Sequence, residues 1–420
     1  MTVTPISARH VPSAPVIVAS PRFERSESPP AAILRVAVQE GPLARERAAQ
    51  LTGSSIATVN RHVSALLSAG LLRERADLSA SGAVGRPRVP FETNHEPFAT
   101  LGIHIGAAVT TLVASDIRGK LLGGIRIATP LGHQLTALAS IAQSAASFTA
   151  RFRRQFLWAG IALGGRVDPR SGTATHPRLD WLDAPVGEVI GEALGVPVSV
   201  SPHVEAMAAA ELLFTPTQDA ASANERSSLY FYARETVGTA LTLDGRVHTP
   251  NSGPGSISHF PTGSSVACPC GRNGCLEATV SDQAMIDRGI ERGVLSPDTA
   301  SITELHHKAR AGDPSATAIL TERAEVLGQI VAMLRDLFNP DDVILGGQAF
   351  TQFPEAMPAF AQSFARNTAL LGRNVLVTGF GNRVQEHAAA AVALSVLHAD
   401  PLAALQKAHL AQTAHTVGAV

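Results

Sequence analysis

The sequence predicts an α/β protein with a small helical domain at the N-terminus and a larger body of two α/β lobes. Helical patterns fill residues 31–67, before any clear strand pattern occurs. From residue 101 onward strand-like and helix-like segments alternate, and a second set of strands begins near residue 226. The chain has 420 residues, too many for one ordinary core, so two or three domains are expected.

The composition is that of a globular protein, with 45% apolar and 16% charged residues. No apolar run approaches the length of a membrane helix, so no membrane partner is expected. Residues 1–30 are rich in Pro and Ser and lack the apolar core of a signal peptide. We therefore expect a disordered leader over residues 1–30 and a cytoplasmic protein.

The charge is distributed unevenly along the chain. Residues 1–95 contain 11 Arg and 7 acidic residues, which gives +4, so the remainder of a chain with net charge −1 carries −5. A basic N-terminal part on an acidic body favours an anionic partner for that part. A solvated fluctuation of charge explains the asymmetry equally well.

Three short helices are predicted in residues 31–95, which we assign to one domain. The first ends at Gly41-Pro42, the second covers about residues 44–51 and is closed by Gly53, and the third covers residues 55–67 with Ser55 as its N-cap. Apolar residues at helical spacing, from Val59 to Leu67, form one face of the third helix. This order is typical of a helix-turn-helix, whose second helix enters the major groove by its N-terminal end.

The opposite face of the third helix is polar near its N-terminus. We expect four of its residues to contact the major groove or flanking phosphates: Ser55, Thr58, Asn60 and Arg61. The polar stretch 73–91 predicts a wing-like hairpin, in which Arg86 and Arg88 flank a proline and can lie along phosphates or in a narrow minor groove. The alternative is a three-helix scaffold domain with an arginine-rich loop.

The body predicts two lobes, residues 96–225 and 226–400, followed by a tail, residues 401–420. The first lobe has expected strands at 101–106, 110–120, 124–130 and 157–163 and a helix at 136–154, with a hairpin at Arg118-Gly119. The second has expected strands at 229–233, 239–243, 246–248, 343–345 and 375–378 and helices at 316–338, 354–367 and 385–398. This order predicts an actin-like, ribonuclease-H-like fold with a ligand cleft between its lobes.

All three cysteines of the chain lie in one short stretch, after a histidine. Three thiolates and an imidazole, from His259, Cys268, Cys270 and Cys275, suit a closed tetrahedral zinc site of structural type. Gly271 and Gly274 let the backbone curl back to the same ion. A disulfide would leave one cysteine over, and an iron–sulfur cluster normally has a fourth; buried or idle thiols remain the alternative.

The pattern H-x8-C-x-C-G-x2-G-C-L-E resembles the zinc motif of the ROK family of repressors, open reading frames and sugar kinases. Other matching stretches are Gly85-Arg86-Pro87 after the wing, residues 243–246, and Asn339-Pro340 leading to Gly346-Gly347. The resemblance covers residues 31–399. It implies a winged helix-turn-helix domain followed by a two-lobed actin-like ATPase (ROK) domain with structural zinc. It also implies that the protein binds an operator in double-stranded DNA and responds to a sugar effector linked to carbohydrate metabolism. The expected assembly is a homodimer or homotetramer.

The resemblance fails where kinases of this family handle phosphate. Their first strand, G-I-D-I-G-G-T, has an aspartate that organises magnesium, and His104 stands at that position. Their second phosphate loop, G-T-G-x-G, is replaced by residues 234–238, which include Arg234 and Glu235. Side chains replace glycines that let the backbone approach phosphate, and the carboxylate of Glu235 would repel a triphosphate.

The sugar side departs in the same way. The general-base aspartate of the kinases is His203, a sugar-binding asparagine is Pro202, and a sugar-contacting glutamate is Ser256. The two sugar contacts that match are His259 and Glu277, although Glu277 could equally be a carboxylate that caps a helix. We therefore expect no enzyme activity, because phosphoryl transfer depends on positioning and charge stabilisation.

The predicted function is sequence-specific DNA binding by a ROK transcriptional regulator, in this family more often a repressor, controlled by a sugar and without kinase activity. One alternative is a degenerate or active ROK sugar kinase. The other is a ROK-type regulator whose sugar pocket has decayed and which a protein partner controls.

Overall fold

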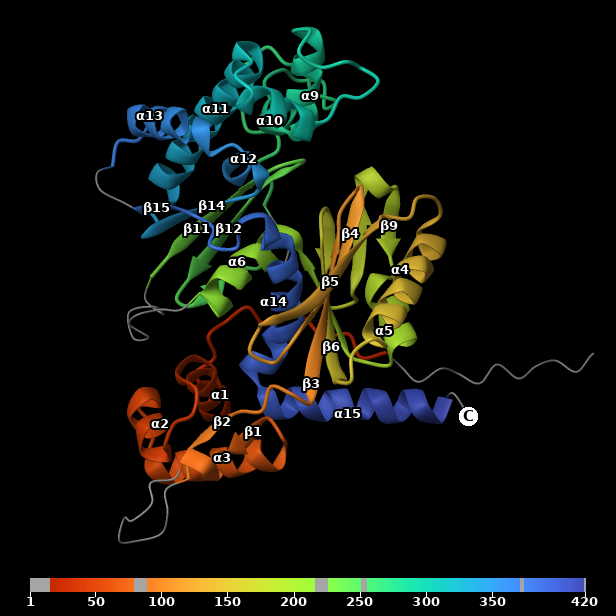
Figure 1. The fold of residues 1–420 in the computed structure, drawn as a ribbon, viewed down its shortest axis with the longest axis vertical. Helices are drawn as coiled ribbons and strands as arrows, with labels where there is room; N and C mark the ends of the chain where they lie inside the picture. The colour runs from red at the N-terminus through yellow and green to blue at the C-terminus, as the bar shows by residue number, and fades with distance from the viewer. Residues whose placement is uncertain (1–15, 79–88, 216–225, 251–254, 371–373, 419–420) are drawn as a thin grey trace, which may run out of the picture. The chain divides into compact units, whose positions relative to one another are not determined.

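The computed structural model describes residues 16–78, 89–215, 226–250, 255–370 and 374–418. The chain divides into two compact units (Figure 1). The first comprises Met1–Arg22, Ser26–Ser201 and Val392–Val420, and the second comprises Phe23–Arg25 and Pro202–Ala391.

The first unit begins with three helices: α1 (Pro29–Glu40), α2 (Arg45–Thr52) and α3 (Ile56–Ser68). They match the predicted helices, and α1 and α2 end at Gly41 and Gly53, whose φ angles of +73° and +63° favour glycine. A short antiparallel pair, β1 (Leu72–Glu74) and β2 (Phe91–Thr93), follows α3. Apolar residues of the helices and of β2, among them Ile33, Leu66 and Phe91, are fully buried and form the core of this part.

A five-stranded sheet forms the rest of the first unit, in the order β10-β6-β3-β4-β5. Its strands are β3 (Phe98–Ile105), β4 (Val109–Ser115), β5 (Leu121–Ala128), β6 (Gln155–Leu163) and β10 (Val198–Pro202). Strands β3, β4 and β5 are antiparallel, and β6 runs parallel to β3. Helices α4 (Gln134–Thr149) and α5 (Val186–Leu194) bury their apolar side chains in the core of this sheet. A small sheet of β7 (Arg166–Asp168), β8 (Thr173–His176) and β9 (Trp181–Ala184) lies between β6 and α5 in sequence.

The second unit repeats this topology with the sheet order β13-β12-β11-β14-β15. Its strands are β11 (Ser228–Ala233), β12 (Val237–Leu243), β13 (Arg246–Val247), β14 (Asp342–Gly346) and β15 (Asn374–Val377). As in the first sheet, three antiparallel strands come first, and β14 then adds parallel to β11. Both sheets therefore share one order, in which three antiparallel strands are followed by two more. The sequence predicted an actin-like fold but did not predict β10.

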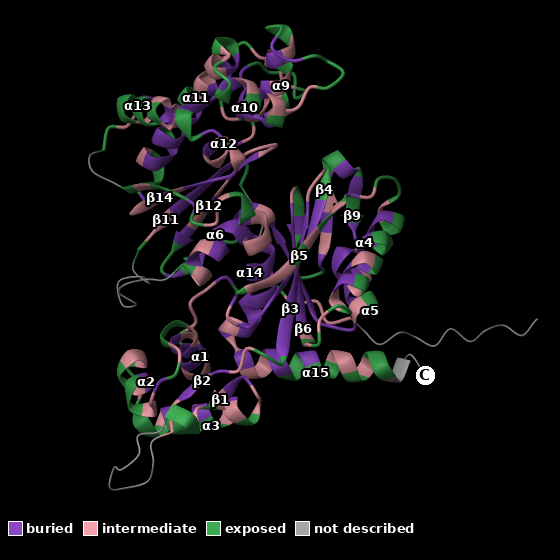
Figure 2. Ribbon diagram, in the orientation of Figure 1, coloured by how far each residue is buried: buried purple, intermediate pink, exposed green. Residues whose placement is uncertain are grey.

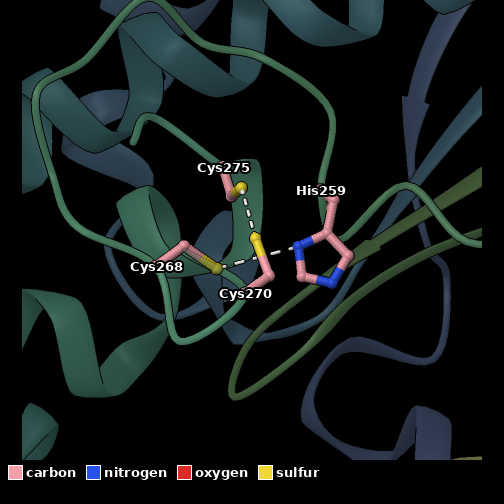
Figure 3. A group of neighbouring side chains, drawn as sticks. All are labelled: His259, Cys268, Cys270 and Cys275. Atoms are coloured by element: carbon pink, nitrogen blue, oxygen red, sulfur yellow. Dashed lines mark hydrogen bonds between the residues drawn. The ribbon is translucent and has the colours of Figure 1, made fainter. Parts of the chain in front are cut away.

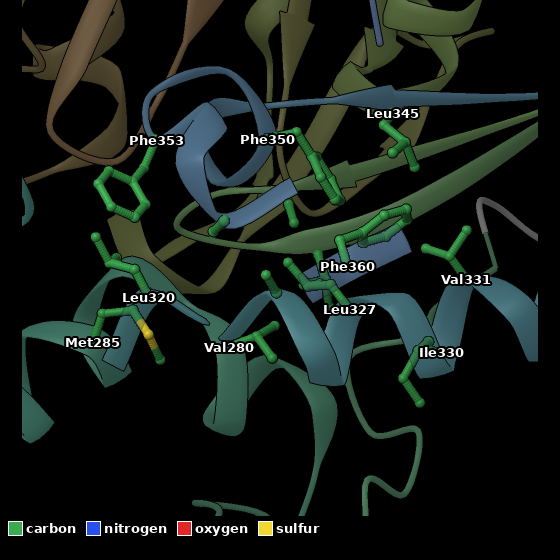
Figure 4. Packing of buried hydrophobic residues seen from close by; sticks show 14 of the residues in the cluster. Val280, Met285, Leu320, Leu327, Ile330, Val331, Leu345, Phe350, Phe353 and Phe360 are labelled. Carbon is green, nitrogen blue, oxygen red and sulfur yellow. The ribbon is translucent and has the colours of Figure 1, made fainter. Parts of the chain in front are cut away.

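Long helices bury the apolar face of this second sheet. Leu327, Ile330 and Val331 of α11 (Pro314–Phe338) pack with Phe350 and Phe360, which come from α12 (Gln348–Thr351) and α13 (Met357–Asn367) (Figure 4). The other helices of the unit are α6 (His203–Phe214), α8 (Leu276–Val280), α9 (Asp282–Glu291) and α10 (Ile302–Arg310). The central strand β11 is buried along most of its length, whereas the edge strand β15 is largely exposed. The helices present exposed outer faces (Figure 2).

Residues 16–28 and 401–418 are more structured than their composition suggested. Residues 16–28 were predicted within a disordered leader, but Val18 pairs with Val198 of β10, and the N–H of Ala19 donates to the carbonyl of Val198 at 2.9 Å. The segment is held because it adds to the edge of the sheet, which local composition does not reveal. The predicted tail is the helix α15 (Pro401–Gly418), which follows α14 (Val384–Ala399) and whose Gln412 donates to the carbonyl of Phe156 at 2.8 Å.

Within the described residues, no single helix is both long and apolar enough to cross a membrane. The bent pair Gly381–Ala399 and Pro401–Thr416, with 111° between its parts, meets the criterion of length and composition only as a pair.

Candidate functional site

The predicted metal ligands come together in the second unit. The ligand atoms of His259, Cys268, Cys270 and Cys275 all lie within 4.8 Å of one another (Figure 3). Cys268 Sγ is 3.7 Å from His259 Nδ1, and Cys270 Sγ is 3.6 Å from Cys275 Sγ. A tetrahedral zinc ion with bonds of about 2.3 Å to sulfur and about 2.0 Å to nitrogen places its ligand atoms about 3.5–3.8 Å apart. The four side chains therefore fit a zinc ion of structural type.

The backbone of the loop explains why these ligands converge. Gly271 and Gly274 have φ angles of +84° and +71°, which L side chains rarely adopt. A Cβ atom on Gly274 would lie 2.5 Å from the carbonyl oxygen of Ser264, whereas one on Gly271 would meet nothing within 4 Å. The N–H of Cys268 donates to the carbonyl of Arg272 at 2.8 Å and closes the turn between the ligands.

The surroundings of the loop act differently on two of its cysteines: burial raises the pKa of Cys275 to about 11, whereas Arg272 favours a thiolate at Cys270. A hydrogen bond with the Arg272 side chain lowers the pKa of Cys270 to about 6. A thiolate is the form that binds a metal, so Arg272 helps to prepare this ligand.

Glu277 lies in the first turn of α8, directly after the metal loop. Its Oε2 accepts hydrogen bonds from the N–H of Val237 at 3.2 Å and from Ser258 Oγ at 3.0 Å. The carboxylate therefore joins the start of β12 to the segment that carries His259. Glu277 thus links two other segments of the chain. Neither the sugar-contact hypothesis nor the capping hypothesis predicted this role.

A second polar cluster surrounds the connection between β11 and β12. Arg234 pairs with Glu235 at 3.6 Å and lies 3.9 Å from Asp282, the first residue of α9. Asp282 also accepts a hydrogen bond of 2.8 Å from Arg323, and both side chains of this pair are almost fully buried. The charged groups of the connection are thus paired with one another.

The N-terminal turn of α6 carries His203 beside this cluster in the same unit. Its ring lies edge-on to Tyr232, with 5.4 Å between ring centroids, and Gln385 lies 3.4 Å from the Tyr232 hydroxyl. Two residues further on, Glu205 is buried, and burial raises its pKa to about 7. The sequence analysis missed Glu205, although its place two residues after His203 on a predicted helix could have drawn attention to it.

The predicted DNA contacts of α3 lie on its outer face. Ser55 is the N-cap, and its Oγ accepts from the N–H of Thr58 at 3.2 Å, as predicted. Ser55, Asn60 and Arg61 are exposed and Thr58 is half-buried. Arg61 Nη2 lies 3.3 Å from His62 Nε2. Arg86 and Arg88 lie outside the described residues.

Comparison with known proteins identifies the family. The model of the ROK family matches residues 100–395, which is more than half of the chain. The chain belongs to the ROK family. The sequence predicted this membership from the metal motif, and the prediction is confirmed.

Relatives of this ROK protein include transcriptional regulators that match it along most of its length. A transcriptional regulator of Mycobacterium tuberculosis strain H37Rv is 51% identical over 93% of this chain and 90% of its own length. The N-acetylglucosamine repressor of Escherichia coli O157:H7 is 25% identical over 78% of this chain and 82% of its own length. These relatives confirm the prediction of a ROK transcriptional regulator.

Solved structures share the fold of this ROK protein. A ROK family transcriptional regulator, described as a homologue of the E. coli Mlc protein, covers 93% of this chain and 99% of its own with a TM-score of 0.73 and 24% identity. A ROK family glucokinase from Streptomyces griseus covers 70% of this chain and 99% of its own with a TM-score of 0.61 and 22% identity. The fold is therefore common to regulators and kinases of the family.

At the positions that kinases of the ROK family use for phosphate and sugar, this chain has other side chains with contacts of their own. His104 is buried on β3 in the first unit. In the second unit, Arg234 and Glu235 pair where the second phosphate loop is expected, and His203 lies against Tyr232 where the general base is expected. Pro202 is buried and Ser256 is exposed.

Proposed function

We propose that this ROK protein is a sequence-specific DNA-binding regulator of the repressor type, with a winged helix-turn-helix in residues 31–95. The exposed N-terminal part of α3 carries the proposal, because Asn60 and Arg61 face outward next to a capped helix start. Ser55 and Thr58 belong to the same contact surface. Arg86 and Arg88 complete it from the wing, on the basis of sequence alone.

The electrostatics of α3 agree with binding to a polyanion. Arg61 contacts only the neutral or weakly basic ring of His62 among the described residues, and no carboxylate is found beside it there. A nearby carboxylate would compete with phosphate for the guanidinium group. The first turn of α3 also contains no acidic residue, so the positive end of the helix dipole faces outward without a counter-charge.

We further propose that zinc occupies the cluster of His259 and the three cysteines as a structural ion. The four ligands leave no position for a reactive water, so the ion would hold the loop in shape. Because Glu277 joins the loop to the start of β12, the ion would also support this part of the second sheet.

We propose no kinase activity and a cytoplasmic location for this regulator. A magnesium–triphosphate substrate would meet Glu235, and the carboxylate that organises magnesium in the kinases is replaced by His104. A sugar effector would use His259 and Glu277. His259 directs Nδ1 toward Cys268, which leaves Nε2 on the other side of the ring for a hydroxyl (Figure 3).

The second candidate is a regulator controlled by a protein partner in place of a sugar. It is favoured by Pro202, which has no side-chain hydrogen-bonding group, and by Glu277, whose Oε2 already accepts two hydrogen bonds. This candidate keeps the same DNA-binding surface and differs only in what controls it.

Fluorescence anisotropy tests the proposal. Labelled DNA from upstream of the protein's own gene is titrated at several salt concentrations, with and without a panel of sugars and sugar phosphates. We expect tight, salt-dependent binding compared with random DNA. Release by one sugar supports sugar control, whereas binding that no sugar affects supports the partner-controlled candidate. Equal affinity for upstream and random DNA would contradict the proposed function.

A further inference from the structure

Residues 16–28 lie against one edge of each five-stranded sheet. Val18 forms a parallel bridge with Val198 in the first unit, and Glu24 forms an antiparallel bridge with Arg246 in the second unit. The bridged strands, β10 and β13, are the outer strands of their sheets. A single segment, which we call the N-terminal strap, therefore covers an edge of both sheets.

The first-unit end of the strap lies in a groove that glycines make possible. A Cβ atom on Gly172 would lie 2.9 Å from a methyl carbon of Val18, and one on Gly187 would lie 3.2 Å from another. A Cβ atom on Gly191 would collide with Val16. Larger side chains at these three positions would exclude the two valines, so the sequence provides room for this segment.

The second-unit end of the strap is held by a buried ring and by hydrogen bonds. Phe23 is 3% exposed, and its carbonyl accepts a hydrogen bond of 2.9 Å from the N–H of Val247. Nε and Nη2 of Arg25 both donate to the carbonyl of Leu212, at 3.0 and 2.8 Å. This end is therefore attached to β13 and to α6 by contacts that do not involve the first-unit end.

The connections between these attachments and the helical domain are short. Residues 20–22 separate the two sheet edges, and residues 26–28 separate the second edge from α1. Three extended residues span at most about 10 Å. The carbonyl of Ser26 also accepts a hydrogen bond of 2.8 Å from Arg35 of α1. The length of the strap therefore limits how far its attachments can move apart.

We propose that the N-terminal strap couples movement of the two units to α1. A change in the relative orientation of the units changes the distance that residues 20–22 must span. Because the connections are short, the strap then either displaces α1 or leaves one of the sheets. Protection of an edge needs one attachment at most, whereas this segment has two in series and continues directly into a helix. The coupling does not depend on what α3 binds.

Double electron–electron resonance of the full-length, zinc-loaded protein without DNA tests this proposal. Spin labels on unnatural amino acids leave the three cysteines to the metal. The labelled positions are exposed: Gln143 on α4 in the first unit, Gln362 on α13 in the second unit, and Gln50 on α2 in the helical domain. We expect a narrow distance distribution for each pair of labels in the natural sequence.

Insertions that lengthen the strap provide the main comparison. Gly-Ser-Gly-Ser-Gly after Ser20 adds a flexible segment of about 12 Å root-mean-square length, and it should widen the distribution between positions 143 and 362 about twofold or more. The same insertion after Glu27 should widen the distribution between positions 50 and 362 and leave that between positions 143 and 362 unchanged. After Gly312, in a turn where a Cβ atom meets nothing within 4 Å, it should change neither.

Arg25→Ala keeps the length of the strap and serves if an insertion prevents folding. The variant loses the bonds to Leu212 and should speed amide hydrogen exchange of Val247 about tenfold or more. It should also widen the distribution between the labels on α4 and α13. Arg226→Ala is the matched control, because it removes a surface ion pair with Asp342 elsewhere in the second unit and should change neither quantity.

Three results would overturn the proposal. The first is a broad distribution between positions 143 and 362 in the natural protein. The second is a distribution that neither the insertion after Ser20 nor Arg25→Ala changes. The third is an insertion after Glu27 that leaves the label on α2 as narrowly placed as before. Since no DNA is present, each result is separate from failure of the proposed function.

Discussion

The metal loop and the β11–β12 connection lie in the same unit, but their polar groups are arranged in opposite ways. In the metal loop four ligand atoms lie within 4.8 Å of one another, and two of the pairs are 3.6 and 3.7 Å apart. At the β11–β12 connection, Arg234 pairs with Glu235, and Asp282 pairs with Arg323. The first arrangement has the donor atoms to hold a cation, whereas the charges of the second are paired within the chain. The difference agrees with the proposal of a ROK protein without kinase activity.

Glu277 connects these two regions. It follows the last metal ligand by two residues, and it accepts a hydrogen bond from Val237 at the start of β12. Loss of the metal should therefore disturb the β11–β12 connection, while changes at the connection should leave the metal in place.

Loss of the metal should have the largest effect. Cys268→Ser, or removal of zinc by a chelator, should lower the free energy of unfolding by more than about 5 kcal/mol, because metal-binding energy contributes directly to folding. Thermal unfolding together with zinc content measures this. Asn273→Ala is the control, since it lies in the same loop and no ligand changes. A zinc-free protein of unchanged stability would exclude a structural ion.

Breaking the buried ion pair of the connection should have the next largest effect. Asp282→Asn leaves the Arg323 guanidinium, whose side chain is 2% exposed, without its counter-charge and should cost about 3–5 kcal/mol. Glu322→Gln removes the partner of Arg292 in an exposed pair and should cost less than about 1 kcal/mol. Urea unfolding of both variants gives the comparison, and zinc content should stay unchanged. Equal costs would contradict the importance of burial here.

The two loop glycines offer a finer test. Gly274→Ala should lower the free energy of unfolding by about 2–3 kcal/mol, because it adds a clash with the Ser264 carbonyl to the strain of a positive φ. Gly271→Ala has the same strain without the clash and should cost about 1 kcal/mol. Zinc affinity should follow the same order. Identical behaviour of the two variants would show that the close approach to Ser264 is unimportant.

Glu205 should give a small, pH-dependent effect. Burial raises its pKa from 4.5 to about 7, so the folded protein holds the proton more tightly than the unfolded chain. The stabilisation is fully present below about pH 4.5 and is lost as the pH rises through about 7. Glu205→Gln should therefore gain about 1–3 kcal/mol of unfolding free energy relative to the natural protein between pH 5 and pH 8. A difference independent of pH would contradict the raised pKa.

Local signals in the sequence were sufficient for much of this structure. Ser55 as a cap, Gly41 and Gly53 as helix ends, and the four metal ligands follow from residue type and spacing. The positions of most strands in the two five-stranded sheets followed from the alternation of segments, although β10 was not predicted. These features depend on neighbours in sequence, which is why they could be predicted.

Other features depend on partners far away in the chain. The pairing of Val18 with Val198 and the packing of α15 through Gln412 link residues about 180 and 250 positions apart. The hydrogen bond from Val237 to Glu277 spans 40 positions. Neither composition nor periodicity carries information on such pairs. The sequence therefore predicted only a disordered leader, a tail, and two alternative roles for Glu277.

The most direct test of the account is the affinity of the protein for DNA from upstream of its own gene, measured by fluorescence anisotropy for the natural sequence and for Arg61→Ala. Arg366→Ala is the control, because it removes the same charge from the exposed surface of α13. We predict a loss of about 1–3 kcal/mol for Arg61→Ala at the cognate site and no change for Arg366→Ala. Equal binding by all three proteins, or binding no tighter than to random DNA, would contradict the assignment of α3 as the DNA-reading helix.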